Sequence, residues 1–171
     1  IVGDDRPTVM IYGHYDVQPA VPLELWRTPP FEPTVRDGRI YARGASDMKA
    51  NLLSVIQAIE ALHATSGEPP VNVIFFFEGE EESGSPTLPP FVAANRDRLH
   101  CDVVLSADSM MDGPDKPVLV TALKGITGCQ IDIRTGESDL HSGMYGAAVL
   151  NAAQVASRLA ASFHRPDGAV A

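Results

Sequence analysis

The chain has 171 residues, of which 44% are hydrophobic and 20% charged, and its formal net charge is −9. This length and composition are typical of a globular protein with one domain, or with one domain and part of a second. The negative charge argues against a nucleic-acid partner and against electrostatic docking to anionic membranes, and no segment approaches the roughly 20 apolar residues of a membrane helix.

The first predicted strand is short and apolar and covers Thr8–Tyr12, followed at once by Gly13-His14-Tyr15-Asp16. This strand therefore ends in potential ligands. Residues 17–33 hold five of the fourteen prolines and the only tryptophan, which predicts a long irregular segment. Within Thr34–Tyr41, the Asp37-Gly38 pair is the commonest signal for a hairpin turn.

A helix is predicted from the segment Arg43–Lys49 to about Ser66. Its apolar residues recur at helical spacing and form one stripe: Leu52, Val55, Ile56, Ile59 and Leu62. Gly67 is expected to end the helix.

The segment Val71–Ser85, VNVIFFFEGEEESGS, joins a long apolar run to four glutamates: Glu78, Glu80, Glu81 and Glu82. The run predicts a strand buried on both faces of a parallel sheet, with the acids at its carboxyl end, where open α/β sheets place ligands. Four neighbouring carboxylates repel one another, and a polyvalent cation would relieve that repulsion. The alternative is a solvated acidic loop.

After this segment, Pro89-Pro90 favours the start of a short helix to about Leu99. A third buried strand is predicted at Asp102–Ser106, and Asp108 stands just past its end.

The character of the chain changes after Pro114. Val118–Ala122 and Cys129–Ile133 are predicted to be strands, and strict alternation in the second favours an antiparallel sheet with one wet face. The segment HSGMYG, which starts at His141, leads into an amphipathic helix to about Phe163. We place a domain boundary near Ala122, which gives domains 1–121 and 122–171.

The two cysteines, Cys101 and Cys129, are isolated in apolar, strand-like contexts and lack metal-ligand spacing. The first residues, IVGDDRPT, are unlike a signal peptide. We therefore expect a reduced, cytoplasmic protein rather than a secreted one.

Three strand ends and one helix start thus present a set of imidazole and carboxylate groups: His14, Asp16, Asp47, Glu81, Glu82 and Asp108. This donor set suits zinc, manganese or cobalt. Taken singly, each residue has an ordinary interpretation: a satisfied polar His14, an N-cap at Asp47, and a turn residue at Asp108. Together they predict a metal site, in which a carboxylate such as Asp47 could bridge two ions.

Five motifs, GHYDVQP, DGRIYARGASDMK, EGEEESGS, SAD and DLHSG, occur in the order found in a known family. The chain resembles the dinuclear zinc aminopeptidase-like family, which includes aminoacylase, succinyl-diaminopimelate desuccinylase, carboxypeptidase G and carnosinase-like dipeptidases. It is most similar to the cytosolic nonspecific dipeptidases. The resemblance implies a three-layer αβα catalytic sheet over 1–121, followed by the start of an α+β, ferredoxin-like lid and dimerisation domain over 122–171.

The resemblance also implies roles for individual residues. Asp47 would bridge two divalent metals, most often zinc. His14 and Asp108 would complete one metal site, and Glu82 would bind the other metal. Glu81 would act as the general base, and Asp16 would orient His14. The catalytic role of His141 would be to reach the active site of a homodimer partner and steady an oxyanion there.

The implied activity is metal-dependent hydrolysis of dipeptides or short peptides. An N-acyl-amino-acid deacylase of the same family, a non-catalytic metal-binding or dimerisation module, and a metal-free acidic interaction domain are the alternatives. We expect the chain to be a fragment that lacks the returning C-terminal half and its metal-binding histidine. One complete metal site and little or no activity of the chain alone are therefore expected.

Overall fold

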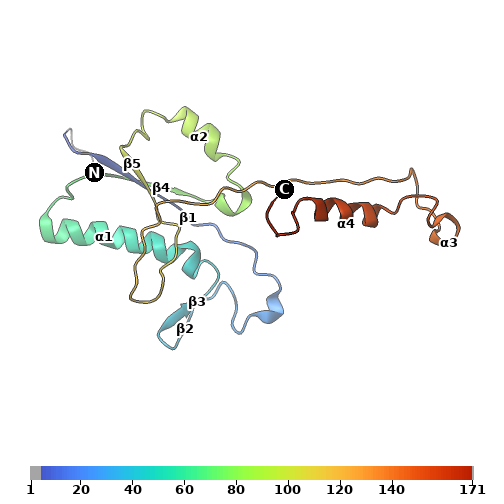
Figure 1. The fold of residues 1–171 in the computed structure, drawn as a ribbon. Helices are drawn as coiled ribbons and strands as arrows, with labels where there is room; N and C mark the ends of the chain where they lie inside the picture. Colours follow the sequence, from blue (N-terminus) through green and yellow to red (C-terminus); the bar gives the residue numbers. More distant parts are fainter. Residues whose placement is uncertain (1–4, 171) are drawn as a thin grey trace. The chain divides into compact units, whose positions relative to one another are not determined.

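Figure 1 shows a computed structural model of the protein, which describes residues 5–170. Its elements fall into two units, Ile1–Thr121 and Ala122–Ala171. The strands are β1 (Thr8–His14), β2 (Thr34–Arg36), β3 (Arg39–Tyr41), β4 (Asn72–Glu78) and β5 (Val103–Ser106). The α-helices are α1 (Ala50–Ser66), α2 (Leu88–Ala94), α3 (Ser142–Tyr145) and α4 (Ala152–Ser162). Short helical turns cover Leu23–Leu25, Ala45–Lys49 and Glu81–Ser83.

The first unit is built on a parallel sheet with the strand order β4-β1-β5. Along β1, Thr8 lies opposite Asn72 and His14 lies opposite Glu78. Because the strands are parallel, their carboxyl ends meet at one edge of the sheet. The predicted α/β class, with a parallel sheet and helices, is therefore confirmed.

Helices α1 and α2 cover opposite faces of this sheet. Tyr12 and its register partner Phe76 point to one face, where the Phe76 ring stacks on Phe91 of α2 at 5.8 Å. Gly13 points to the other face, and a Cβ atom there would lie 2.6 Å from side-chain atoms of Leu52 and Met48. A larger residue at this position would therefore force the Leu52 and Met48 side chains to shift. Figure 1 shows α1 below and α2 above the strands, which gives an αβα arrangement.

The expectation that β4 is buried on both faces is wrong in part. In the described sheet β4 is an edge strand and β1 is the middle one, and the side chain of Phe75 is 41% exposed. β5 is also exposed along its length. An apolar run indicates that a strand can be buried. Burial also requires a neighbouring strand on each side and a packed layer on each face of the sheet.

The predicted hairpin and the predicted long helix are both confirmed. β2 and β3 pair in antiparallel fashion around Asp37 and Gly38, whose φ angles of 49° and 73° are those of a tight hairpin turn. α1 ends at Ser66, and Gly67 caps it through its backbone N–H. Before α1, Asp47 leaves the helical conformation, and its peptide bond to Met48 is cis.

The strands predicted at Val118–Ala122 and Cys129–Ile133 are wrong for this structure. Both segments are exposed except for the half-buried Ile133, and neither has regular secondary structure. Alternation of polar and apolar residues makes a segment fit for a sheet, but a strand exists only where a neighbour accepts its backbone hydrogen bonds. The helix predicted to end near Phe163 is confirmed as α4, whose N-terminus is capped by the Asn151 side chain.

The structure divides into two units between Thr121 and Ala122. A catalytic role for the first unit and a lid role for the second stay predictions. Both cysteines are free. Among residues 5–170, no helix has the length and apolar character needed to cross a membrane.

Met48 connects the first helix to the sheet, and its replacement tests that packing. Its side chain is fully buried (0% exposed), and its sulfur accepts the backbone N–H of His14 at 3.1 Å. We expect Met48→Ala to lower the free energy of unfolding by about 2–5 kcal/mol, because it leaves a cavity.

Met110, which is 85% exposed, provides the matched control. Met110→Ala should change stability by less than about 0.5 kcal/mol in urea denaturation. Equal losses in the two variants would contradict this packing.

Candidate metal centre

The carboxyl edge of the sheet collects the residues that the sequence singled out in the first unit. His14 is the last residue of β1, and Asp108 follows β5 by two positions. Glu81 and Glu82 lie in the helical turn after β4, and Asp47 lies in the turn before α1. Residues far apart in sequence thus reach one place because parallel strands end at the same edge.

His14 is the centre of this group. Its side chain is 1% exposed, and its Nδ1 lies 3.1 Å from the backbone oxygen of Asp16. A neutral ring that donates this hydrogen bond keeps a free lone pair on Nε2. That nitrogen faces carboxylate oxygens of Asp47 at 3.1 Å, Asp108 at 3.8 Å and Glu81 at 4.0 Å.

Three potential ligand atoms, one each from His14, Asp47 and Glu82, lie within 4.8 Å of one another. One imidazole and two carboxylates match the donor set that zinc, manganese and cobalt accept. In addition, the Oδ1 atom of Asp16 is buried without a well-aligned hydrogen bond, 3.2 Å from Nδ1 of His14. The residues therefore fit a divalent cation. Its positive charge would balance the carboxylates around His14, which the described protein groups leave partly unbalanced.

The crowding of these groups changes their proton affinity. Burial raises the pKa of Glu81, and the carboxylates of Glu82 and Asp108 raise it further, although His14 acts in the opposite direction. Burial and the Asp47 carboxylate likewise raise the pKa of Asp108. For His14, burial lowers the pKa, but the Asp16 carbonyl and the surrounding carboxylates outweigh this and raise it overall.

Neutral amide groups hold two of these acids in place. The Gln18 side chain donates to Oε2 of Glu82 at 2.8 Å, and the Glu82 backbone N–H donates to the Asp16 carboxylate at 3.0 Å. The Asn51 side chain donates to the backbone oxygens on either side of Asp108, those of Ala107 at 2.7 Å and Ser109 at 2.9 Å.

Sequence reasoning did not assign these supporting residues. Gln18 lies inside the GHYDVQP motif, and Asn51 lies one helical turn after Asp47, so each had a local signal. A further support was also missed: the Tyr12 hydroxyl donates to the Glu78 carboxylate, which ties the end of β4 to β1. Burial and the Glu78 side chain raise the pKa of Tyr12.

Glu80 and His141 each make contacts within their own unit. Glu80, which the sequence left out of the site, accepts hydrogen bonds from the backbone and hydroxyl of Thr87. His141 belongs to the second unit, where its Nδ1 accepts the Gly143 backbone N–H at 3.0 Å and caps α3. A neutral His141 ring in this arrangement presents Nε2 as a hydrogen-bond donor.

Comparison with known proteins gives a consistent match over this chain. The model of Peptidase family M20/M25/M40 matches residues 10–170. Cys-Gly metallodipeptidase dug1 of Schizosaccharomyces pombe is 40% identical over 147 residues, which are 84% of this chain and 31% of the relative. Beta-Ala-His dipeptidase of Rattus norvegicus is 36% identical over 154 residues, which are 88% of this chain and 31% of the relative.

A solved structure agrees with these relatives. The M20 family metallo-carboxypeptidase from Sulfolobus solfataricus superposes with a TM-score of 0.83 at 33% identity, over 99% of this chain and 38% of that one. The chain thus spans about a third of the length of the curated relatives it matches.

The raised pKa values predict how pH affects metal binding. His14, Glu81 and Asp108 all have pKa values above their ordinary 6.5, 4.5 and 3.8. The folded metal-free protein therefore binds more protons than the unfolded chain from about pH 4 to above about pH 6.5, so the stability these groups contribute falls as pH rises through that window. A cation binds the deprotonated ligands, so the stability that metal binding adds increases as pH rises.

We therefore expect zinc to raise the melting temperature by several degrees more at about pH 7.5 than at about pH 5.5. Asp47→Ala should remove most of this difference, because it deletes a carboxylate next to Nε2 of His14. An equal zinc effect at the two pH values in the unmodified protein would contradict the ligand set.

The contact between Gln18 and Glu82 predicts a second effect on metal binding. Gln18→Ala removes the amide that fixes the Glu82 carboxylate, so the dissociation constant for a divalent metal should rise about tenfold or more. Gln130 is the matched control, because its side-chain amide donates to the Asp132 carboxylate in the other unit. Gln130→Ala should leave the affinity measured by calorimetry unchanged, and equal affinities in both variants would refute the role of Gln18.

Proposed function

Because this chain belongs to peptidase family M20/M25/M40, we propose that the whole protein hydrolyses the amide bond of dipeptides or short peptides with a free carboxylate. The observation that carries this proposal is the convergence of His14, Asp47 and Glu82 ligand atoms within 4.8 Å, with Glu81 beside them. The relatives named as dipeptidases support this substrate class.

The residues divide into ligands and proton carriers. His14 and Asp108 would hold one divalent metal, Glu82 would hold a second, and Asp47 would lie between the two. When bound, the metal supplies Lewis acidity, which makes a water acidic enough to lose a proton near neutral pH. Zinc is the proposed metal, with manganese and cobalt as alternatives.

Glu81 is proposed to take the proton from the attacking water and pass it to the leaving amine. Its Oε2 lies 4.0 Å from Nε2 of His14, so its carboxylate faces the same space as the ligands. Burial and neighbouring carboxylates raise its pKa, which brings a carboxylate closer to the range in which a general base works at neutral pH.

Two histidine roles complete the proposal. Asp16 would orient His14 through the contacts at Nδ1, 3.1 Å from its carbonyl and 3.2 Å from its carboxylate. His141, whose Nε2 is free to donate, would stabilise the developing oxyanion from a homodimer partner. The homodimer and a cytoplasmic location stay predictions.

We further propose that the 171-residue chain alone does not turn over substrate. Among residues 5–170, it offers His14, Asp47 and Asp108 to one metal, but Asp47 and Glu82 alone to the other. Two ligands leave a metal weakly held and incompletely coordinated. Cleavage of dipeptides by this chain would overturn the inactivity and leave the assignment of the whole protein standing.

The role of Glu81 gives the direct test of the proposed function. In the whole protein, Glu81→Gln should lower kcat for dipeptide hydrolysis by about 10²–10⁴-fold, because the amide cannot accept a proton. Metal content should be unchanged. Glu80→Gln, in the adjacent position and bonded to Thr87, should keep full activity.

Equal activity of the two glutamine variants would exclude Glu81 as the base. Hydrolysis of N-acyl amino acids in place of dipeptides would assign the deacylase alternative instead. Metal binding without turnover of either substrate class would assign the non-catalytic module.

A further inference from the structure

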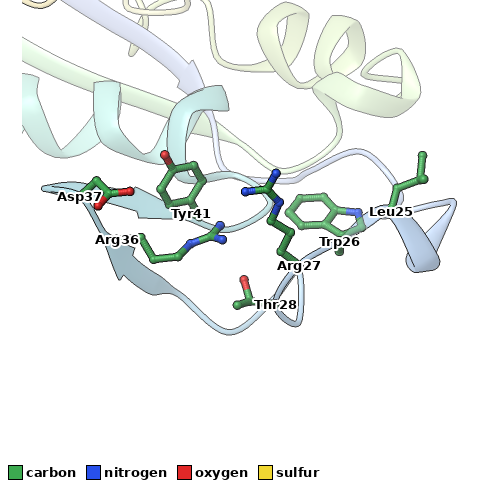
Figure 2. Close-up of a pocket in the computed structure, with 7 residues that line it drawn as sticks. All are labelled: Leu25, Trp26, Arg27, Thr28, Arg36, Asp37 and Tyr41. Carbon is green, nitrogen blue, oxygen red and sulfur yellow. The ribbon is translucent and has the colours of Figure 1, made fainter.

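The first unit contains a cavity of about 510 Å³ between the β2–β3 hairpin and the irregular segment before it (Figure 2). The segment contributes Trp26, Arg27 and Thr28 to the lining, and the hairpin contributes Arg36, Asp37 and Tyr41. This volume lies in the range of sites for small organic molecules. None of these residues belongs to the candidate metal centre.

The cavity lies in a cationic region of an acidic protein. The net charge of the chain is −9, yet residues 27–43 contain four arginines and only two acids. Two of these arginines, Arg27 and Arg36, line the cavity from opposite walls. Figure 2 shows both guanidinium groups on the cavity side of the backbone, toward Tyr41 and Trp26. This local field attracts an anion against the charge of the whole chain.

Arg36 is held against an aromatic ring of the cavity lining. Its guanidinium lies over the Tyr41 ring, 4.2 Å from the centroid, which holds its plane in position. Its Nε atom is buried and has no hydrogen-bond partner among the described residues. Because that atom has almost no accessible surface, an oxyanion in the cavity would accept from the terminal N–H groups of the guanidinium.

The apolar wall is also held in position. The Arg43 guanidinium lies 5.1 Å from the Trp26 ring centroid and donates to the Pro19 carbonyl at 3.0 Å. The indole therefore has a fixed neighbour on one side. Rigid aromatic rings beside a planar cation form a site for a molecule with a flat apolar body and an anionic end.

We propose that this cavity binds a small organic oxyanion, with the anionic group on Arg36 and Arg27 and the apolar body against Trp26. A carboxylate is the expected group, because the Asp37 carboxylate in the lining disfavours a ligand of higher negative charge. The site is separate from the proposed hydrolysis, so either proposal can fail without the other.

The single tryptophan of the chain lines the cavity, so its fluorescence reports occupancy directly. The probes are 3-phenylpropionate, which carries a carboxylate and a ring, and inorganic phosphate, which carries an oxyanion alone. We expect saturable quenching by 3-phenylpropionate at concentrations up to about 10 mM. Arg36→Gln should weaken this binding about tenfold or more, because it removes a charge-assisted hydrogen bond.

Arg39 provides the matched control, since it lies opposite Arg36 in the hairpin but outside the cavity lining. Arg39→Gln should bind the probe as the unmodified protein does. Arg27→Gln tests the opposite wall, and circular dichroism together with zinc affinity verifies that each variant is folded.

Saturation by phosphate with the same loss in Arg36→Gln would support the oxyanion site but contradict the preference for a carboxylate with an apolar body. Absence of saturation with both probes would overturn the proposal. Equal effects of Arg36→Gln and Arg39→Gln would overturn it too, because a diffuse positive field would then explain the binding.

Discussion

The burial of one imidazole among carboxylates is the constraint on which the candidate site depends. His14 is 1% exposed, and carboxylate oxygens from four acids lie within 4.0 Å of its ring nitrogens. Acids this close repel one another, and burial adds to the cost of their charge. Positive charge stabilises this arrangement, either as protons on the ring and the acids or as a cation among them.

The sheet makes this crowding unavoidable. The parallel register places His14 opposite Glu78, so the loops that follow β1 and β4 start side by side. The Tyr12 hydroxyl and the Tyr15 backbone N–H both bond to Glu78, which ties these strand ends together. The same geometry that makes a parallel sheet therefore brings the acids together.

Much of this could be predicted from the sequence because the signals were local. An apolar run followed at once by ligands marks a strand end, and Asp37-Gly38 marks a hairpin, whatever surrounds them. The exposed state of β5, the edge position of β4 and the missing strand at Cys129–Ile133 could not be predicted in this way. Each depends on whether another strand lies alongside, and residue spacing does not report that. The contacts of Gln18 with Glu82 and of Asn51 with the Asp108 loop likewise depend on how distant loops meet.

The side chains that hold the acids in place are neutral amides, and their neutrality matters for metal binding. Gln18 holds Glu82 through an amide, and Asn51 holds the Asp108 loop through backbone oxygens. The nearby Lys49 donates to the Tyr15 carbonyl rather than to an acid. Within residues 5–170, no lysine or arginine forms an ion pair with the acids around His14. An ammonium or guanidinium group at these places would neutralise the carboxylates and compete with a metal, whereas an amide fixes their direction and leaves their charge intact. Four of the ten arginines of the chain fall instead within residues 27–43, on the hairpin and beside it, where their positive charge suits an anion. The two regions thus differ in charge: acids predominate around His14, whereas arginines outnumber acids within residues 27–43.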